Sequence, residues 1–131
     1  RTRVEHEDNA VQMGKVAGRN MAGGNENYTH IPMFYSDLFD LGYEAVGEMS
    51  SKMKTVEDWQ NQPFKKGVVY YMDDGRVRGV LLWNVWDKVD DARALMMEKG
   101  PFKEEFVTCG GIDLKQIEPA TMEKRTVIQL D

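Results

Sequence analysis

A β-hairpin signature between residues 67 and 84 constrains this chain more than any other feature of its sequence. Gly67–Met72 is a run of β-branched and aromatic residues, Asp73-Asp74-Gly75 supplies an Asp-Gly turn, and Arg76–Asn84 reads as the return strand. Alternation divides the return strand into two faces, with Val77, Gly79, Leu81 and Trp83 on one and Arg78, Val80, Leu82 and Asn84 on the other. We expect Trp83 to anchor a core on its face.

Two further strands are predicted upstream of this hairpin. Met33–Leu38 and Gly42–Met49 carry apolar and aromatic residues and are joined by a short turn around Asp40. Residues 50–66 are polar and irregular, which favours a mobile loop. The aromatic side chains of these strands and of the hairpin are expected to be mostly core: Tyr28, Phe34, Tyr35, Tyr43, Tyr70, Tyr71, Trp83 and Trp86.

Two helices are predicted. The first spans residues 5–21 and ends at Gly23-Gly24, and one of its faces is lined by small residues and a methionine. That face consists of Ala10, Gly14, Ala17 and Met21. The second spans residues 88–99, with Asp87 as its N-cap and Gly100-Pro101 after it. Its inward stripe is Val89, Ala92 and Met96.

The tail after Gly100 gives weaker signals. Helical turns are predicted at 103–107 and 112–117, and a short strand at 126–130. Together the elements predict an α+β fold, an antiparallel sheet of four to five strands with helices packed on its face and ends.

Composition and motifs exclude several function classes. The 17 Lys and Arg against 22 Asp and Glu give a net charge of −5, which argues against DNA binding by this fragment. No stretch reaches the ~18 apolar residues of a membrane span. Cys109 is the single cysteine, expected to be a small, partly buried residue, and His6 and His30 lack ligand spacing, so no metal site is predicted. No nucleophile–base pair, P-loop or GxGxxG motif is present, and no catalytic residue is predicted.

A set of short motifs resembles a known family. The motifs are the run Arg3–Val11 with Gly14, Ala17-Gly18 and Asn20-Met21, followed by Met33–Leu38, Gly42–Gly47, Lys66–Val68, Gly79–Asn84 and Ala92-Arg93. Their order and spacing are similar to those at the end of apoptosis-inducing factors. The likeness covers roughly residues 1–100, and the tail departs from it. It implies two parts, 1–24 as the last helix of a flavin-binding domain and 25–131 as the C-terminal α+β domain.

The resemblance also implies a function. Members are mitochondrial flavoproteins that use FAD and NAD and oxidise NADH, so the parent protein is expected to do the same, while this fragment alone is expected to bind no cofactor and to lack catalysis. The family implies location in the mitochondrial intermembrane space, binding of the intermembrane-space import oxidoreductase, a homodimer of the reduced full-length protein, and movement to the nucleus after apoptotic release.

Four cofactor-binding residues follow from the resemblance. Glu5 and His6 match the family pair at the start of the helix that points at the flavin, and unpaired N–H groups there suit a flavin edge or a carboxamide. Tyr35 stands where many members carry Trp, and Glu44 matches a carboxylate that faces the nicotinamide site.

An alternative reading is a non-catalytic interaction module. The hairpin 67–84 or the strand 126–130 would offer a sheet edge to an extended partner segment. The isolated fragment is expected to be a monomer or a swapped species. A domain that only stabilises its neighbour is a third reading.

Overall fold

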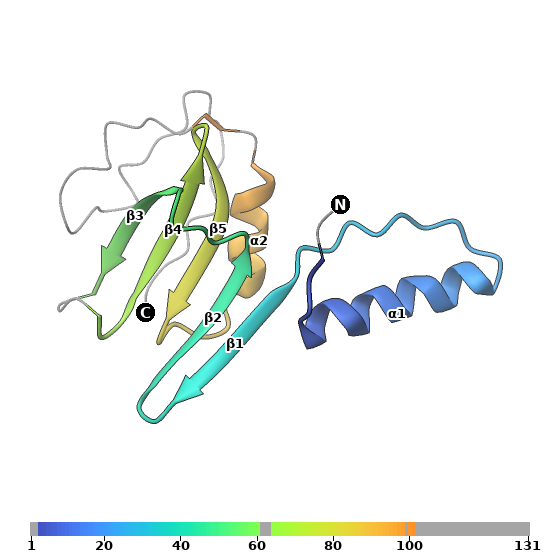
Figure 1. The fold of residues 1–131 in the computed structure, drawn as a ribbon, viewed down its shortest axis with the longest axis horizontal. Helices are drawn as coiled ribbons and strands as arrows, with labels where there is room; N and C mark the ends of the chain where they lie inside the picture. The colour runs from blue at the N-terminus through green and yellow to red at the C-terminus, as the bar shows by residue number, and fades with distance from the viewer. Residues whose placement is uncertain (1–2, 61–63, 99, 102–131) are drawn as a thin grey trace.

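The computed structural model describes residues 3–60, 64–98 and 100–101 (Figure 1). Its elements in chain order are α1 (Glu7–Met21), β1 (Met33–Leu38), β2 (Leu41–Gly47), β3 (Lys54–Trp59), β4 (Gly67–Asp73), β5 (Arg76–Trp83) and α2 (Val89–Met97). The elements predicted at 103–107, 112–117 and 126–130, and Cys109, lie outside the described residues.

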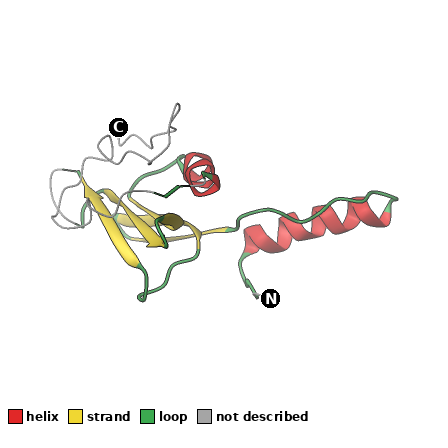
Figure 2. Cartoon of the chain, turned by 90° about the horizontal axis from the view of Figure 1, so that it is seen from above, coloured by secondary structure: helices red, strands yellow, loops and turns green. Residues whose placement is uncertain are grey.

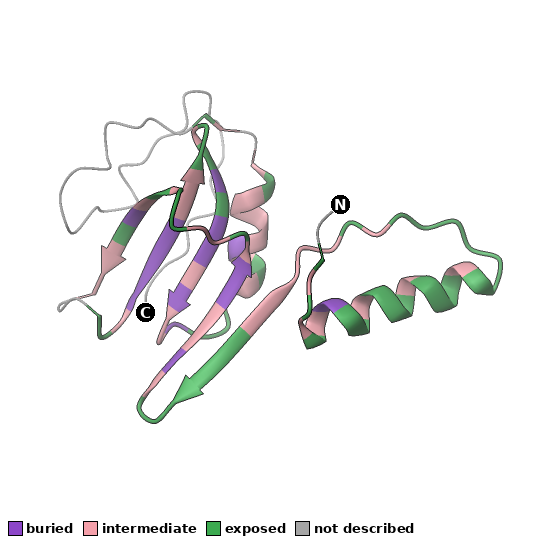
Figure 3. Cartoon of the chain, viewed as in Figure 1, coloured by how far each residue is buried: buried purple, intermediate pink, exposed green. Residues whose placement is uncertain are grey.

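All five strands form one antiparallel sheet in the order β1-β2-β5-β4-β3, which confirms the predicted α+β class. Helix α2 covers one face of this sheet (Figure 2). The core lies between α2 and that face, and burial is concentrated on the central strands (Figure 3). Its members are Val46, Val56, Val68, Tyr70, Val77, Val80, Leu82, Val85 and Ala92.

The segment 50–66, predicted as a mobile loop, contains the strand β3. It pairs with β4 from Lys54↔Met72 to Trp59↔Gly67. Only Val56 of this strand is buried. An edge strand needs few inward apolar residues and gains from outward charge, so its polar composition looked like a loop. The loop prediction is therefore wrong for this part of the chain.

A β-bulge changes the facing of β5. Tyr71 pairs with Gly79 but Met72 pairs with Val77, so Arg78 is an extra residue on β5. The bulge brings Val77 onto the core face together with Val80 and Leu82, contrary to strict alternation. Trp83 falls on the reverse face, where its ring stacks on Tyr43 at 6.1 Å between centroids. The prediction that Trp83 anchors the core is wrong.

The hairpin β4–β5 is enclosed on both sides, because β2 pairs with β5 and β3 pairs with β4. It cannot offer the free edge that the interaction-module reading assigned to residues 67–84. Within the described residues, the outer strands of the sheet are β1 and β3.

Helix α2 packs through the predicted stripe, with Ala92 in the core and Val89 and Met96 packed against it. Its N-cap is Lys88 and not Asp87, and no side chain caps it. Asp87 instead adopts φ +61°, which places it outside the cap geometry.

Helix α1 stands away from the sheet beyond β1 (Figure 2). Its polar junction with the sheet is the Asp8 carboxylate, whose Oδ2 accepts the Met33 backbone N–H at 3.0 Å and lies 2.6 Å from His30 Nε2. Arg93 of α2 reaches the same oxygen at 3.4 Å. The predicted small face is exposed, and a Cβ added at Gly14 or Gly18 would have nothing within 4 Å among the described residues.

Candidate functional site

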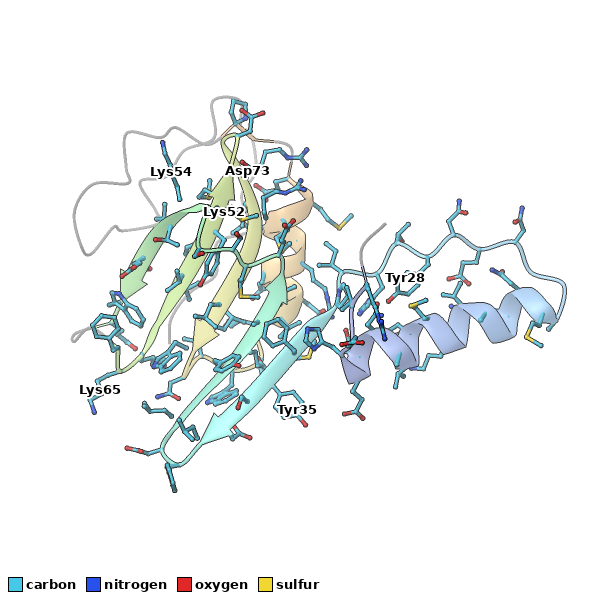
Figure 4. The ribbon with its side chains drawn as sticks, in the orientation of Figure 1. Tyr28, Tyr35, Lys52, Lys54, Lys65 and Asp73 are labelled. Carbon is cyan, nitrogen blue, oxygen red and sulfur yellow. The ribbon has the colours of Figure 1, made fainter. Side chains whose placement is uncertain are left out.

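Tyr35 and Glu44 face each other across the β1–β2 pairing. They lie on the same sheet face as Val46, since side chains two residues apart on a strand share a face. Directly opposed Cβ atoms are about 4.5–5.5 Å apart, so the two side chains are neighbours. Tyr35 is 61% exposed, and Figure 4 shows its ring projecting beside β1. The structure therefore joins two of the four predicted residues.

The Glu44 carboxylate is held in an unfavourable setting for a negative charge. Burial raises the pKa of Glu44, and the nearby Asp87 carboxylate raises it further, while a hydrogen bond from the Asp87 backbone N–H partly offsets both. Glu44 Oε2 is shielded from solvent and finds no hydrogen-bond partner among the described residues. An added cation or hydrogen-bond donor would relieve this carboxylate.

Trp86 lies beside this pair. A Cβ on Gly42 would stand 2.5 Å from Trp86 Cη2 and 2.8 Å from Asp37 Oδ1, so the indole covers the strand position that precedes Glu44 on the same face. Trp86 is 46% exposed, so the prediction that it belongs to the core is wrong. Sequence reasoning missed it because it lies between β5 and α2, where Asn84 and Asp87 both adopt positive φ.

We name the Glu44 surface by its five residues: Tyr35, Asp37, Glu44, Trp86 and Asp87. Its charge is negative. Residues 31–51 hold four carboxylates and no Lys, Arg or His. These carboxylates are Asp37, Asp40, Glu44 and Glu48. Two exposed aromatic rings beside a cluster of carboxylates favour a flat ligand that is cationic or rich in donors.

The other two predicted residues lie elsewhere. The His6 ring stacks on Phe34, with centroids 4.4 Å apart and an interplanar angle of 19°. Phe34 points to the face of β1 opposite Tyr35, so His6 belongs to an aromatic row that continues through Tyr43 to Trp83. Glu5 is exposed and pairs with Arg3 at 2.7 Å. In this chain Tyr35 and Glu44 thus share one face of the sheet, His6 packs on the opposite face of β1, and Glu5 is exposed beside Arg3.

The Glu44 surface can position a ligand and act on its charge. Among the described residues, no group of three His, Cys, Asp or Glu side chains is arranged to hold a metal ion. No helix in the described part of the chain has the length and apolar character to cross a membrane. The chemistry available to the Glu44 surface is stacking, charge pairing and hydrogen bonding.

Comparison with known proteins identifies the family. Residues 17–62 and 57–98 match the family described as apoptosis-inducing factor, mitochondrion-associated, C-term. The chain belongs to this family. It is 41% identical over 110 residues to apoptosis-inducing factor 1, mitochondrial, of Dictyostelium discoideum, which covers 76% of this chain and 21% of that protein. It is 34% identical over 86 residues to monodehydroascorbate reductase 3 of Arabidopsis thaliana, covering 61% and 20% respectively.

A solved structure shares the fold of this apoptosis-inducing-factor domain. The covalent putidaredoxin reductase–putidaredoxin complex contains a chain that superposes with a TM-score of 0.65 at 21% identity, covering 78% of this chain and 24% of the other. The present chain spans about a fifth of the length of the relatives it matches. It corresponds to one part of such proteins.

Proposed function

We propose that this domain forms one wall of the cofactor site in a mitochondrial, FAD-dependent NADH oxidoreductase. The observation that carries the proposal is the register pair Tyr35–Glu44, an exposed ring beside a carboxylate that has one oxygen without a hydrogen-bond partner in the described part of the chain. Membership of the apoptosis-inducing-factor family supports it, as does the name of the Dictyostelium relative.

The residues present fit a nicotinamide better than they fit a whole flavin nucleotide. The carboxamide of a nicotinamide carries N–H donors that suit a carboxylate such as that of Glu44, and its ring suits the exposed face of Tyr35. The chain has no GxGxxG motif to cradle a pyrophosphate, so FAD would be held by other parts of the protein. His6 and Glu5 at the start of α1 are proposed to meet the flavin in that larger protein.

The bound cofactors would supply hydride transfer between nicotinamide and flavin. This chain's own residues would orient the nicotinamide, through stacking at Tyr35 and charge at Glu44. No side chain of the Glu44 surface is required to act as an acid or a base.

The test uses the longer protein that carries this domain. Its absorption spectrum should show an oxidised flavin, and NADH should produce a long-wavelength band from the reduced flavin–nicotinamide pair. Tyr35→Ala should weaken that band and raise the KM for NADH, whereas Phe64→Ala, the loss of another exposed ring between β3 and β4, should change neither. A longer protein without flavin, or a Tyr35→Ala variant with unchanged kinetics, contradicts the proposal.

We further propose the intermembrane space as the location and release to the nucleus in apoptosis, on the resemblance alone. A fluorescent fusion of the full-length protein, followed before and after an apoptotic stimulus, tests both. A fusion that stays in the cytosol, or that never leaves mitochondria, contradicts the corresponding part.

A second candidate function, the binding of an extended segment of the import oxidoreductase, is favoured by the edge of β1. Gly47 N–H donates to Pro32 C=O, so antiparallel alternation directs the backbone groups of Tyr35 and Asp37 away from β2. A bound segment should slow amide exchange at these two residues and leave β4 unchanged. Exchange that stays fast with the partner present contradicts this candidate.

A further inference from the structure

We propose that the Glu44 surface selects a planar aromatic cation over its neutral counterpart, with Trp86 as a second ring that contacts the ligand. The proposal rests on the proposed function and extends it, because the oxidised nicotinamide ring is a pyridinium cation and the reduced ring is neutral.

The first step is the placement of two rings beside one carboxylate. Tyr35 lies directly across the strand pairing from Glu44, and the Trp86 indole covers Gly42, the preceding position on the same face. Same-face positions along a strand are about 7 Å apart, so both rings border Glu44. A ligand of one aromatic ring is therefore large enough to touch either ring and the carboxylate.

The second step is the rigidity of the Trp86 segment. The Asn84 side chain accepts the Gly42 backbone N–H at 2.7 Å and donates to Lys65 C=O at 2.8 Å, while Val85 is buried in the core. The segment is thus fixed to both β2 and the β3–β4 connection. Trp86 is presented on a fixed backbone, and 46% of it remains exposed to a ligand.

The third step is charge. Asp37 and Asp87 flank Glu44, and the charge that most affects the pKa of Glu44 is the negative charge of Asp87. An aromatic face attracts a cation, and a carboxylate that no cationic side chain neutralises gains from one. A neutral ring of the same shape gains only the stacking. The difference in affinity between two such ligands therefore measures the electrostatic contribution to binding alone.

The experiment titrates the 131-residue chain with two probes, 1-methylnicotinamide, which is a cation, and nicotinamide, which is neutral with the same ring and carboxamide. Indole N–H resonances report binding, and Trp59 and Trp83 are internal references because they lie away from the Glu44 surface. We expect shifts at Trp86 and about fivefold tighter binding of the cation, as an exposed cation–π contact with a charge pair allows.

Variants separate the contributions. Glu44→Gln should abolish the preference for the cation, and Trp86→Ala should weaken cation binding while Trp86→Phe restores most of it. Glu48→Gln, which removes an exposed carboxylate next to the end of β2, should change neither affinity nor preference. The protection of core amides at Val68 and Leu82 shows that each variant is folded.

Equal affinities for the two probes, no binding of either, or shifts confined to Trp59 or Trp83 would overturn the proposal. These outcomes are independent of the proposed oxidoreductase. A longer protein that lacks flavin leaves the cation preference of this chain intact, and a chain without that preference leaves the flavin spectrum of the longer protein unaffected.

Discussion

Asp8 Oδ2 and the Arg93 guanidinium lie 3.4 Å apart although 85 residues separate them in the chain. Each side chain is about one-fifth exposed, and His30 lies 2.6 Å from the same carboxylate oxygen. Arg93 also donates to Ile31 C=O at 3.0 Å. This junction ties α1, the start of β1 and α2 together, and it thereby places His6 against Phe34.

Asp8→Ala should release α1 from the sheet. The Met33 N–H loses its acceptor, so its amide should exchange about tenfold faster or more, as expected for a lost hydrogen bond to a charged group worth about 2 kcal/mol. Nuclear Overhauser contacts between His6 and Phe34 should weaken. Glu7→Ala removes the adjacent exposed carboxylate and should leave both signals unchanged. Persistence of the His6–Phe34 contacts in Asp8→Ala would show that the junction does not orient the helix.

The junction should also open at low pH. Burial of Asp8 acts to raise its pKa, but the hydrogen bonds from His30 and Met33 and the charges of His30 and Arg93 outweigh it, so the pKa of Asp8 is lowered. A lowered folded-state pKa stabilises the fold above the unfolded-state value, near pH 4 for a free Asp, and the contribution is lost as pH falls through the folded-state pKa. Met33 amide protection should fall over this range in the wild type and stay low and flat in Asp8→Ala.

Glu44→Gln should stabilise the chain at neutral pH. Burial and the Asp87 carboxylate raise the pKa of Glu44 in the folded state, so ionisation of Glu44 costs stability as pH rises through that pKa. The amide removes the charge and keeps the shape. Urea unfolding should show a higher midpoint for the variant at pH 7 and little difference once Glu44 is protonated. A lower midpoint at pH 7 would mean that the ionised carboxylate has a stabilising partner.

Two glycines should respond in opposite ways to alanine. A Cβ on Gly79 would collide with the backbone carbonyl of Glu48, so Gly79→Ala should cost about 2 kcal/mol or more in urea unfolding. A Cβ on Gly14 meets nothing within 4 Å, so Gly14→Ala should favour helix α1 by about 1 kcal/mol, seen as added helical circular dichroism. Equal effects of the two changes would contradict the close approach of β5 to Glu48.

Tyr70→Phe should be neutral or stabilising, by up to about 1 kcal/mol in urea unfolding. Tyr70 Oη is buried and has no hydrogen-bond partner among the described residues, and burial together with the Asp58 charge raises the pKa of Tyr70. The substitution keeps the ring and removes a polar atom that has no hydrogen-bond partner in the described part of the chain, so it relieves the cost of desolvating that atom. Tyr71→Phe, on the neighbouring, less buried ring, is the matched control. A loss of stability in Tyr70→Phe would reveal a hydrogen bond to Oη.

Local signals in the sequence predict most of the sheet and miss its irregular parts. The Asp-Gly turn and the alternation in Met33–Leu38 identify four of the five strands, and the stripe Val89, Ala92 and Met96 identifies the packed side of α2. The strand β3 is missed because an edge strand with one buried residue has a loop-like composition. The bulge at Arg78 is missed because it depends on the pairing with β4.

The candidate site is only partly visible in the sequence. Tyr35 and Glu44 lie nine positions apart in the sequence, and only the family motifs single them out. The register of the β1–β2 pairing makes them neighbours. Trp86 joins them through a turn whose positive φ values at Asn84 and Asp87 no local pattern signals. His6 separates from them because Phe34 and Tyr35 point to opposite faces of one strand.

The strand order has a consequence for how this sheet assembles. The chain lays down β1, β2 and then β3 at the opposite margin, and the middle stays vacant until β4 and β5 fill it. During synthesis, therefore, the first half of the chain offers β2 no partner strand other than β1. The β1–β2 pair and β3 can join one sheet only after β5, which ends at Trp83, has been synthesised. The β4–β5 hairpin therefore completes the sheet, and a chain truncated before β4 would leave β3 unpaired and β2 paired on one side only.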